Sequence, residues 1–562
     1  MAAYRKEIIV GPKIKFFTIS CLFLLLSLVI LLSTFRLKTL VFVLDNRNID
    51  VLALPHEGPH VKQFPPSPLI SFLKNELSGN ENIKVGLVNT EKIDNEYWYF
   101  LGETVAVGFD RVSNKIQWKD FMREWIDEEH KYRKPKCPEI PMPEFEKYGN
   151  DLDVVISRVP CGNETDAARG NGIRDVFRLQ VNLVVANLVA RSRRNDKPVY
   201  VVFIGSCGPM IEIFRCDDLV KHEGDIWIYK PDLKRLQQKV QMPVGSCELA
   251  TPFLKQGGSI DYDFTKLGKS IPIDNPREAY VTVLHSSESY VCGAISLAQS
   301  IIHTNSTRDM VILVDESITL KSRQELEFAG WKIKLIDRIR SPHARKNAYN
   351  EWNYSKLRIW QLTEYDKLIF IDSDLVLLRN IDDFFAYPQL SAVGNDRVRF
   401  NSGIMLIEPS KCMFESLMEK RYTVFSYNGG DQGFLNEVFT WWHRWPKRLN
   451  HLKLRPKNAS APEIPESRYA VHFLGFKPWT CYRDYDCNWL RKDHNSFASD
   501  MVHRMWWQVY DLMPERLQKV CGLTKVKDQK IQQWRRMAEN AKLPDEHWKI
   551  SITDPRHINL VD

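Results

Sequence analysis

Two kinds of apolar periodicity alternate along the chain from residue 277, and this alternation restricts the fold more than any other feature. Short runs rich in β-branched residues are typical of strands, and they lie at 279–286, 309–316, 331–337 and 367–375. Segments with helical spacing separate them, at 290–303, 322–330 and 354–365. Strands that alternate with helices favour a mostly parallel sheet covered on both faces. The sequence therefore predicts an α/β domain over 277–500, with ligands at the carboxyl ends of its strands.

A smaller α/β region precedes this domain. Strand-like runs at 152–159, 198–205 and 225–231 surround a segment at 176–192 whose apolar residues have helical spacing. We therefore expect a separate N-terminal α/β region over 146–270.

The segments around these two regions have other patterns. Residues 36–145 combine a proline-rich part with a charged part and are predicted to form a stem. The pattern of residues 501–562 predicts a helical C-terminal region.

The N-terminus contains a long uncharged segment. Residues 16–35 carry no charge, and 20 apolar residues suffice for a helix to cross roughly 30 Å of hydrocarbon. Basic residues precede the segment, which favours a cytosolic tail over 1–15 and a transmembrane signal anchor over 16–35. A cleaved signal peptide is the alternative, but no cleavage-type site follows the segment. We expect the rest of the chain to lie in the lumen of the secretory pathway.

The cysteines and glycosylation sequons suit that compartment. None of the eleven cysteines has the C-x-x-C spacing of a zinc site, so disulfides or free buried cysteines are expected, with Cys481 and Cys487 as a local candidate pair. Sequons occur at Asn163, Asn305, Asn353 and Asn458. The net charge of +8 is spread over 562 residues, which does not favour nucleic-acid binding.

Two carboxylates interrupt an apolar run. Asp372 and Asp374 follow the strand-like residues 368–371, where burying an unpaired charge would be costly. Alternation places both on the same side of the chain, and oxygen ligands suit Mg²⁺ or Mn²⁺. The sequence therefore predicts a divalent-metal site, with two solvated acids as the alternative.

Four further segments carry polar groups that suit a binding site. They are N-S-G at 401–403, N-G-G-D-Q at 428–432, H-F-L-G-F-K at 472–477, and Lys356, which lies one strand before the acids. Each has a structural alternative: a turn, N-capping of a helix by Asp431, or a solvated side chain.

Together these segments, from about residue 280 to 479, resemble the retaining glycosyltransferases of family 8, which include glycogenin and galactosyltransferases. The likeness is closest to the plant glucuronosyltransferases that place glucuronic acid on xylan, through "NAYNEWNYSKLRIWQLT", "SYNGGDQGFLNEVFTWWHRWPK" and "KPWTCYRDYDCNW". Two departures from the wider family are Asn428, where glycogenin-like members have aspartate, and a His472–Lys477 spacing that is one residue shorter.

The resemblance implies a fold and a set of site residues. The fold is α/β, a GT-A type Rossmann-like nucleotide-sugar-binding domain, preceded by the small α/β layer and the transmembrane helix. Mn²⁺ would be held by Asp372, Asp374 and His472, and Lys356 and Asp431 would be catalytic. The substrate-binding set is Tyr290, Asp372, Ser373, Asp374, Asn401, Ser402, Gly403, Asn428, Gly429, Gly430, Asp431, Gln432, His472, Phe473, Leu474, Gly475, Phe476 and Lys477.

The chemistry implied is transfer of glucuronic acid from UDP-glucuronate to xylan in α linkage. Retention of the sugar's anomeric configuration is compatible with two mechanisms. One forms a covalent intermediate on Asp431, and in the other the acceptor attacks from the leaving-group face. Arg358, Arg397 and Arg399 are the arginines nearest to the motifs in sequence and are the candidate partners of the glucuronate carboxylate, with a solvent-exposed side chain as the alternative for each.

The resemblance also implies a setting. It is the Golgi membrane, with a single-pass type II topology and complexes with other xylan-synthesis enzymes. The alternatives are a family 8 transferase with another UDP-sugar or acceptor, glycogenin-like or galacturonosyl, and a non-catalytic Golgi scaffold.

Overall fold

The computed structural model describes residues 68–78, 82–91, 98–122, 138–148, 151–161, 174–192, 197–241, 276–455 and 468–560. The predicted cytosolic tail and signal anchor lie outside these ranges. Within them, no helix combines the length and the apolar character needed to cross a membrane.

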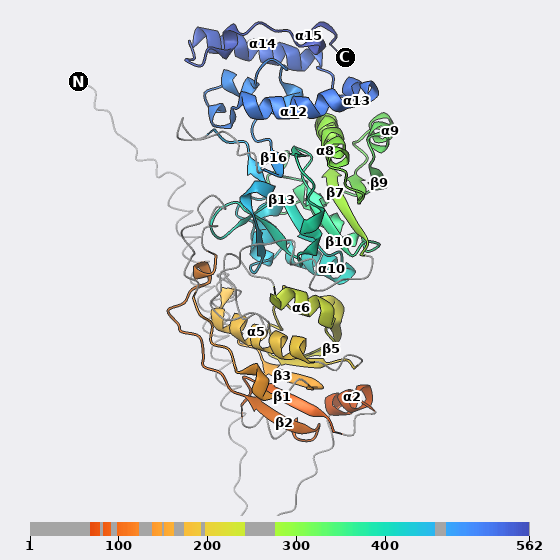
Figure 1. Cartoon of the computed structure of the whole chain (residues 1–562), viewed down its shortest axis with the longest axis vertical. Helices are drawn as coiled ribbons and strands as arrows, with labels where there is room; N and C mark the ends of the chain where they lie inside the picture. Colours follow the sequence, from red (N-terminus) through yellow and green to blue (C-terminus); the bar gives the residue numbers. More distant parts are fainter. Residues whose placement is uncertain are drawn as a thin grey trace, which may run out of the picture. The chain divides into compact units, whose positions relative to one another are not determined.

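The N-terminal region is built on a six-stranded sheet of order β2-β1-β3-β4-β6-β5 (Figure 1). Its strands are β1 (Lys84–Val88), β2 (Glu103–Val107), β3 (Val154–Arg158), β4 (Tyr200–Ile204), β5 (Leu219–Glu223) and β6 (Ile226–Tyr229). The first four are parallel, and β5 and β6 add an antiparallel edge.

Alternating side chains bury both faces of this sheet. Leu69, Ile70 and Leu73 of helix α2 (Pro68–Glu76) pack with one set of strand residues. The long helix α5 (Val176–Arg191) packs on the opposite set, and Asp175 caps its first turn by accepting from the N–H groups of Phe177 and Arg178. Helix α6 (Leu233–Gln241) lies beside α5.

This sheet extends beyond the predicted boundary at residue 145. Strands β1 and β2 lie inside the segment predicted to be a stem, yet β1 is hydrogen-bonded to β3 along its length. The five-residue strand at 84–88 is buried on both faces and shows no alternation, so the sequence pattern alone did not distinguish it.

The second region contains a seven-stranded sheet of order β14-β12-β13-β10-β7-β8-β9. Its strands are β7 (Glu278–Leu284), β8 (Asp309–Val314), β9 (Lys332–Leu335), β10 (Lys367–Ile371), β12 (Ser391–Gly394), β13 (Phe400–Ile407) and β14 (His443–Trp445). Strands β10, β7, β8 and β9 are parallel, as predicted, whereas β13 is antiparallel to both neighbours.

Helices cover both faces of this sheet. One face packs against α8 (Val291–His303) and α12 (Asp500–Leu512), and the other against α10 (Lys411–Lys420) and α11 (Asp431–Val438). Among the described residues this region also has the α-helices α9 (Leu320–Phe328), α13 (Glu515–Val520), α14 (Lys525–Asn540) and α15 (Pro555–Ile558). The two regions share one apolar core, because α5 and the second sheet contribute to the same cluster of buried side chains.

The helix expected at 354–365 is a 3₁₀ helix, η6 (Asn353–Gln361). Tyr354, Leu357 and Trp360 are fully buried and follow one another at intervals of three residues. This spacing matches the three-residue turn of a 3₁₀ helix, which places all three on one face.

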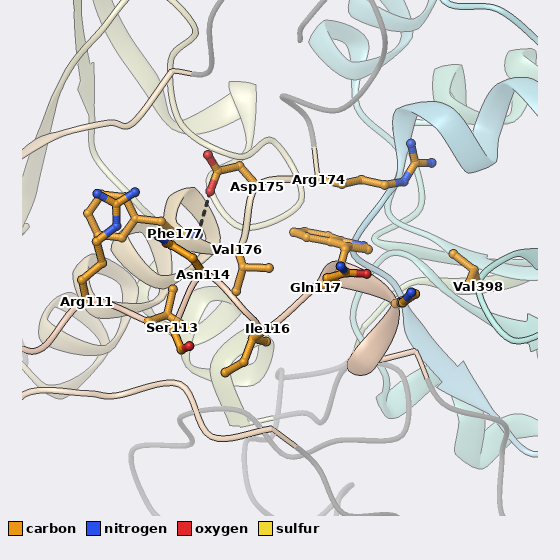
Figure 2. A pocket seen from close by; sticks show the side chains of 13 residues that line it. Arg111, Ser113, Asn114, Ile116, Gln117, Arg174, Asp175, Val176, Phe177 and Val398 are labelled. Atoms are coloured by element: carbon orange, nitrogen blue, oxygen red, sulfur yellow. Dashed lines mark hydrogen bonds between the residues drawn. The ribbon is translucent and has the colours of Figure 1, made fainter.

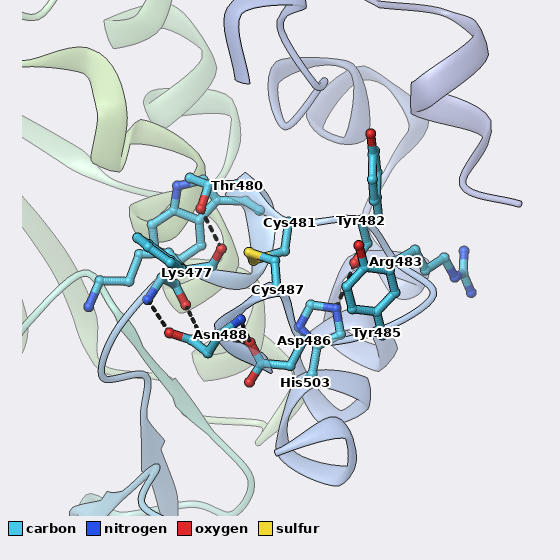
Figure 3. The surroundings of a disulfide bond; sticks show 12 residues. Lys477, Thr480, Cys481, Tyr482, Arg483, Tyr485, Asp486, Cys487, Asn488 and His503 are labelled. Atoms are coloured by element: carbon cyan, nitrogen blue, oxygen red, sulfur yellow. Dashed lines mark hydrogen bonds between the residues drawn. A yellow bond between two sulfur atoms is a disulfide. The ribbon is translucent and has the colours of Figure 1, made fainter. Parts of the chain in front are cut away.

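Four disulfides lie among the described residues. Cys481–Cys487 confirms the local pair expected from the sequence, and Figure 3 shows it beside Tyr482 and Asn488. Cys161–Cys207 lies within the N-terminal region, Cys216–Cys412 joins that region to α10, and Cys292–Cys521 joins α8 to the C-terminal helices. Links between distant segments reduce the conformational freedom of the unfolded chain.

Candidate active site

The D-x-D segment lies at the carboxyl end of β10, in the middle of the second sheet. Asp372 follows the last residue of this strand, and its N–H donates to the carbonyl of Gly403 on β13, 2.8 Å away. The chain continues into the short strand β11 (Leu375–Leu377), which pairs antiparallel with β16 (Ala470–His472). That pairing sets Leu375 opposite His472 and brings the imidazole to the acids from about a hundred residues away.

Asp372, Asp374 and His472 form a cluster with the spacing of a metal site. One donor atom from each lies within 4.8 Å of the others, and His472 Nε2 is 3.2 Å from Asp374 Oδ1. Two carboxylates and one imidazole suit a divalent cation. A Cβ built on Gly403 would lie 2.7 Å from His472 Cε1 and 3.1 Å from Asp372 Oδ2, so the glycine leaves the space into which these groups converge.

Two lysines partly neutralise the acids. Lys477 Nζ lies 2.6 Å from Asp374 Oδ2, and Lys356 Nζ lies 3.3 Å from Asp372 Oδ1 and 2.6 Å from Asp431 Oδ2. Three carboxylates thus face two ammonium groups. This charge balance fits a divalent cation.

The surroundings of Lys356 and Asp374 shift the pKa of each group. Burial opposes the ammonium of Lys356, but the Asp372 and Asp431 carboxylates outweigh it and raise the pKa of Lys356. Burial likewise opposes the Asp374 carboxylate, but Lys477 and His472 outweigh it and hold the pKa of Asp374 well below its usual range. Lys356 is therefore a fixed cation at neutral pH and does not act as a base.

Asp431 is held from two sides at the start of α11. Its Oδ2 accepts from the Ser402 hydroxyl at 2.7 Å and from Lys356. The neighbouring Gln432 accepts from the N–H of Ser402 through Oε1 and donates to the Tyr427 hydroxyl through Nε2, at 2.9 Å. The N-S-G and G-G-D-Q segments, 30 residues apart in sequence, therefore form one surface.

Asn428 and the glycines shape the G-G-D-Q loop. The Asn428 side-chain oxygen accepts from the N–H groups of Gly430 and Gly433, both at 3.0 Å, and so caps the start of α11. Gly429 has a φ of 68°, in the left-handed region that glycine adopts without strain. Asn428 thus supports the loop through its own side chain, a role that aspartate oxygens also perform.

The side chains of Phe473 and Phe476 pack within the fold. Phe473 is fully buried, and its carbonyl accepts from Lys477 Nζ at 2.5 Å. Phe476 stacks between His494 and Trp534, with ring centroids 4.0 and 4.3 Å away. Leu474 is half-buried, and Gly475 has a φ of 74°. The Phe473 and Phe476 side chains therefore pack against other side chains of the fold, and the loop holds Lys477 through its backbone.

Several predicted residues lie at the rim of the acid cluster. The ring of Tyr290, 38% exposed, has Lys477 Nζ 5.9 Å from its centroid. Ser373 is buried between the acids. Asn401 accepts from the N–H of Gly403 at 2.8 Å and from the Asn450 amide at 3.0 Å.

The three candidate arginines lie in different surroundings. Arg358 donates to the carbonyl of Asp337 and to Gln361, on the side of η6 that does not carry the contacts to the acids. Arg399 lies 4.2 Å above the ring of Tyr427, whose hydroxyl contacts Gln432. Arg397 is exposed. Of the three, Arg399 is connected to the site, because Tyr427 contacts both Arg399 and Gln432.

Comparison with known proteins agrees with this geometry. A family described as Glycosyl transferase family 8 matches residues 281–482, and one described as GUX1-5 N-terminal domain matches residues 67–247. UDP-glucuronate:xylan alpha-glucuronosyltransferase 2 of Arabidopsis thaliana is 51% identical over 499 residues, covering 86% of this chain and 83% of that protein. The chain belongs to glycosyltransferase family 8.

Other family 8 relatives match with lower identity. UDP-glucuronate:xylan alpha-glucuronosyltransferase 1 of Arabidopsis thaliana is 45% identical, covering 86% of this chain and 74% of that protein. Human glycogenin-1 is 29% identical, covering 44% of this chain and 76% of that protein. The N-terminal match begins at residue 67 and includes β1 and β2, in agreement with the sheet described above.

Sequence reasoning missed two polar residues, one in contact with the acid cluster and one at the end of a neighbouring strand of the sheet. Asn450 contacts His472 Nδ1 through Oδ1 at 3.2 Å and also holds Asn401, and no motif surrounds it. Asp315 is buried at the carboxyl end of β8, 3.0 Å from Arg338 and in contact with the N–H of Ser286. Asp315 carries the same signal as Asp372, a carboxylate directly after an apolar strand, and could have been found in that way.

Proposed function

We propose that this chain is a retaining glycosyltransferase of the GT-A type that moves glucuronic acid from UDP-glucuronate to the xylan backbone in α linkage. The observation that carries the proposal is the convergence of Asp372, Asp374 and His472 at the end of β10, flanked by Lys356 and Lys477. The names of the relatives that are 45–51% identical supply the donor and the acceptor.

The site suits the departure of a nucleoside diphosphate. We assign Mn²⁺ to Asp372, Asp374 and His472, where a bound cation would supply positive charge to the leaving diphosphate. Lys477, held by Asp374 and the Phe473 carbonyl, presents a second positive group at the same place. The contact with Lys477 strengthens as charge develops on the leaving diphosphate, which lowers the barrier to transfer.

Lys356 and Asp431 face the position of the sugar. Lys356 fixes the orientation of the Asp431 carboxylate by direct contact. Gln432 and Asn401 present amide groups beside it, suited to hydrogen bonds with sugar hydroxyls.

We assign the glucuronate carboxylate to Arg399 and expect Arg399→Ala to lower kcat/KM for UDP-glucuronate by roughly 10- to 100-fold. A charge-assisted hydrogen bond contributes on the order of 1.5–3 kcal/mol. Use of UDP-glucose should change little, because that sugar has no carboxylate. The measurement is a panel of UDP-sugars with a xylo-oligosaccharide acceptor.

Arg358→Ala is the matched control, because its guanidinium donates to Asp337 and Gln361 instead. Equal loss with both donors in Arg399→Ala would contradict the assignment. Equal use of both donors by the unaltered protein would contradict the proposed donor. Absence of transfer to xylo-oligosaccharide would contradict the proposed acceptor.

We further propose a Golgi membrane location with the second region in the lumen, alongside other xylan-synthesis enzymes. The uncharged segment at 16–35, the sequons and the disulfides support it. Asn163 and Asn458 lie outside the described residues.

Glycan mapping tests this topology, and Asn353 is expected to carry no glycan. Asn353 begins η6, and a Cβ built on Gly430 would lie 3.7 Å from its amide nitrogen, so a glycan would obstruct the G-G-D-Q loop. Asn305 is exposed at the turn after α8 and is expected to be occupied. Full occupancy at Asn353 would contradict the site, and a chain without any glycan would contradict the lumenal location.

A further inference from the structure

Two adjoining cavities lie where the N-terminal region meets the second region. The first, of about 510 Å³, lies between the loop 111–119, the start of α5 and Val398. Figure 2 shows Arg111 and Phe177 at one end of it and Val398 at the other. The second, of about 420 Å³, lies between Arg174, Val398, Arg399 and α11. Because both cavities are lined by Arg174 and Val398, we describe them together as the interregion groove.

Side-chain contacts connect the second cavity of the groove to the active site. Its second cavity is lined by Arg399, which stacks on Tyr427, and the Tyr427 hydroxyl contacts Gln432 beside Asp431. The same cavity is lined by Asn436, which lies on α11 with Asp431 and binds the backbone of Phe400 at the start of β13. The two elements that carry the G-G-D-Q and N-S-G segments therefore also form a wall of the groove.

Contacts between the two regions hold the groove in place. Arg174 lies 2.9 Å from Glu437 on α11, and the Trp118 indole donates to the carbonyl of Thr440 at 3.2 Å. Glu212 accepts from the N–H and the hydroxyl of Thr440, both at 3.0 Å. Both walls are therefore tied to each other close to the cavities.

The lining has the chemistry of a carbohydrate site. Arg111 lies 4.1 Å above the Phe177 ring, and Gln117 is exposed in the same cavity, so planar donor groups and apolar faces alternate. Sugar rings present both hydroxyls and apolar faces. The acids of the groove are engaged: Asp175 caps α5, Asp396 accepts from backbone N–H groups, and Glu437 pairs with Arg174. Across both cavities the lining has four basic side chains and three acidic ones, so its charge nearly balances. Such a surface suits a polymer of low charge better than a polyanion.

We propose that the interregion groove binds the polysaccharide acceptor, so that the N-terminal region holds sugar units on one side of the transfer point. The proposal rests on the proposed function, because it takes the acceptor to be a polymer. Each cavity lies within the range of roughly 300–1,000 Å³ typical of ligand sites. A short acceptor reaches only the active site, whereas a long one also occupies the groove.

The test is the dependence of transfer on acceptor length, measured with the full chain, UDP-glucuronate and xylo-oligosaccharides of increasing length. The unaltered protein should show a lower KM for long acceptors than for short ones. Arg111→Ala and Gln117→Ala should each raise the KM for long acceptors by roughly tenfold, which corresponds to about 1.4 kcal/mol. The KM for short acceptors and for UDP-glucuronate, and kcat, should stay unchanged.

Lys115→Ala is the matched control, because Lys115 is exposed in the same loop but does not line the cavity. A second measurement, retardation of the protein in gels that contain xylan, should show weaker binding for both groove variants. The groove assignment would be overturned if both variants still had a lower KM for long acceptors than for short ones. It would also be overturned if the unaltered protein had no such difference. Failure of the unaltered protein to use any xylo-oligosaccharide would instead overturn the proposed function.

Discussion

Asp374→Asn is expected to abolish glycosyl transfer, with kcat falling by about 10³-fold or more, the scale of removing a preorganised charge from a transition-state site. Asp374 lies between His472 Nε2, at 3.2 Å, and Lys477 Nζ, at 2.6 Å. Loss of its charge weakens the hold on a divalent cation and leaves Lys477 without its buried partner. Initial rates with UDP-glucuronate and xylo-oligosaccharide measure the effect.

Two controls separate metal binding from folding. Asp383→Asn changes an exposed acid nine residues further along the chain and should leave the rate unchanged. Calorimetric titration with Mn²⁺ should show binding to the unaltered protein and none to Asp374→Asn, and EDTA should stop transfer until Mn²⁺ is added back. Full activity in a correctly folded Asp374→Asn variant would refute the assignment.

Lys356→Met is expected to lower kcat/KM by at least about 10²-fold and to destabilise the fold by about 3–5 kcal/mol, the cost of leaving a buried charge without its partner. Lys356 Nζ lies 2.6 Å from Asp431, 3.3 Å from Asp372 and 3.1 Å from the carbonyl of Ser402. Methionine has a similar shape but no charge, so both carboxylates lose their counter-ion. Steady-state kinetics and thermal unfolding measure the two effects.

A double variant tests the ion pair directly. Lys356→Met with Asp431→Asn removes both charges, so its loss of stability should be smaller than the sum of the two single losses. Lys367→Met is the control, because Lys367 is also buried but donates to the carbonyls of Phe385 and Tyr387. That variant should lose stability while the folded fraction keeps its kcat. Additive stability losses in the double variant would contradict the pairing.

The sequence alone predicted the second region with fair accuracy. Strand-like runs at 279–286, 309–316 and 367–375 correspond to β7, β8 and β10, because fully buried parallel strands need continuous apolar residues. The position of Asp372 at a strand end follows from the same pattern. The first sheet was only partly recognised, because β1 and β2 are short strands within a segment that also contains proline and charge.

The candidate site was predicted through its motifs, and the structure shows where each side chain of these motifs lies. Phe473 and Phe476 lie within the H-F-L-G-F-K motif, but one is fully buried and the other stacks on His494 and Trp534. Asn450 has no motif, and only its contacts with His472 and Asn401 reveal it. A motif identifies a loop, whereas the direction of each side chain depends on what packs around that loop.

What the sequence by itself determined is local: where strands end, where carboxylates follow them, and which segments carry amides, glycines and lysines. The spacing of apolar residues reveals these features, because residues close in sequence lie in the same layer of the fold. The tertiary structure decided which segments meet. The pairing of β11 with β16 brings His472 to Asp374, and Lys356 links Asp372 to Asp431. The groove forms between Gln117, Asp175 and Val398. Such contacts join residues far apart in the chain, and they depend on the packing of the whole core, which no local pattern records.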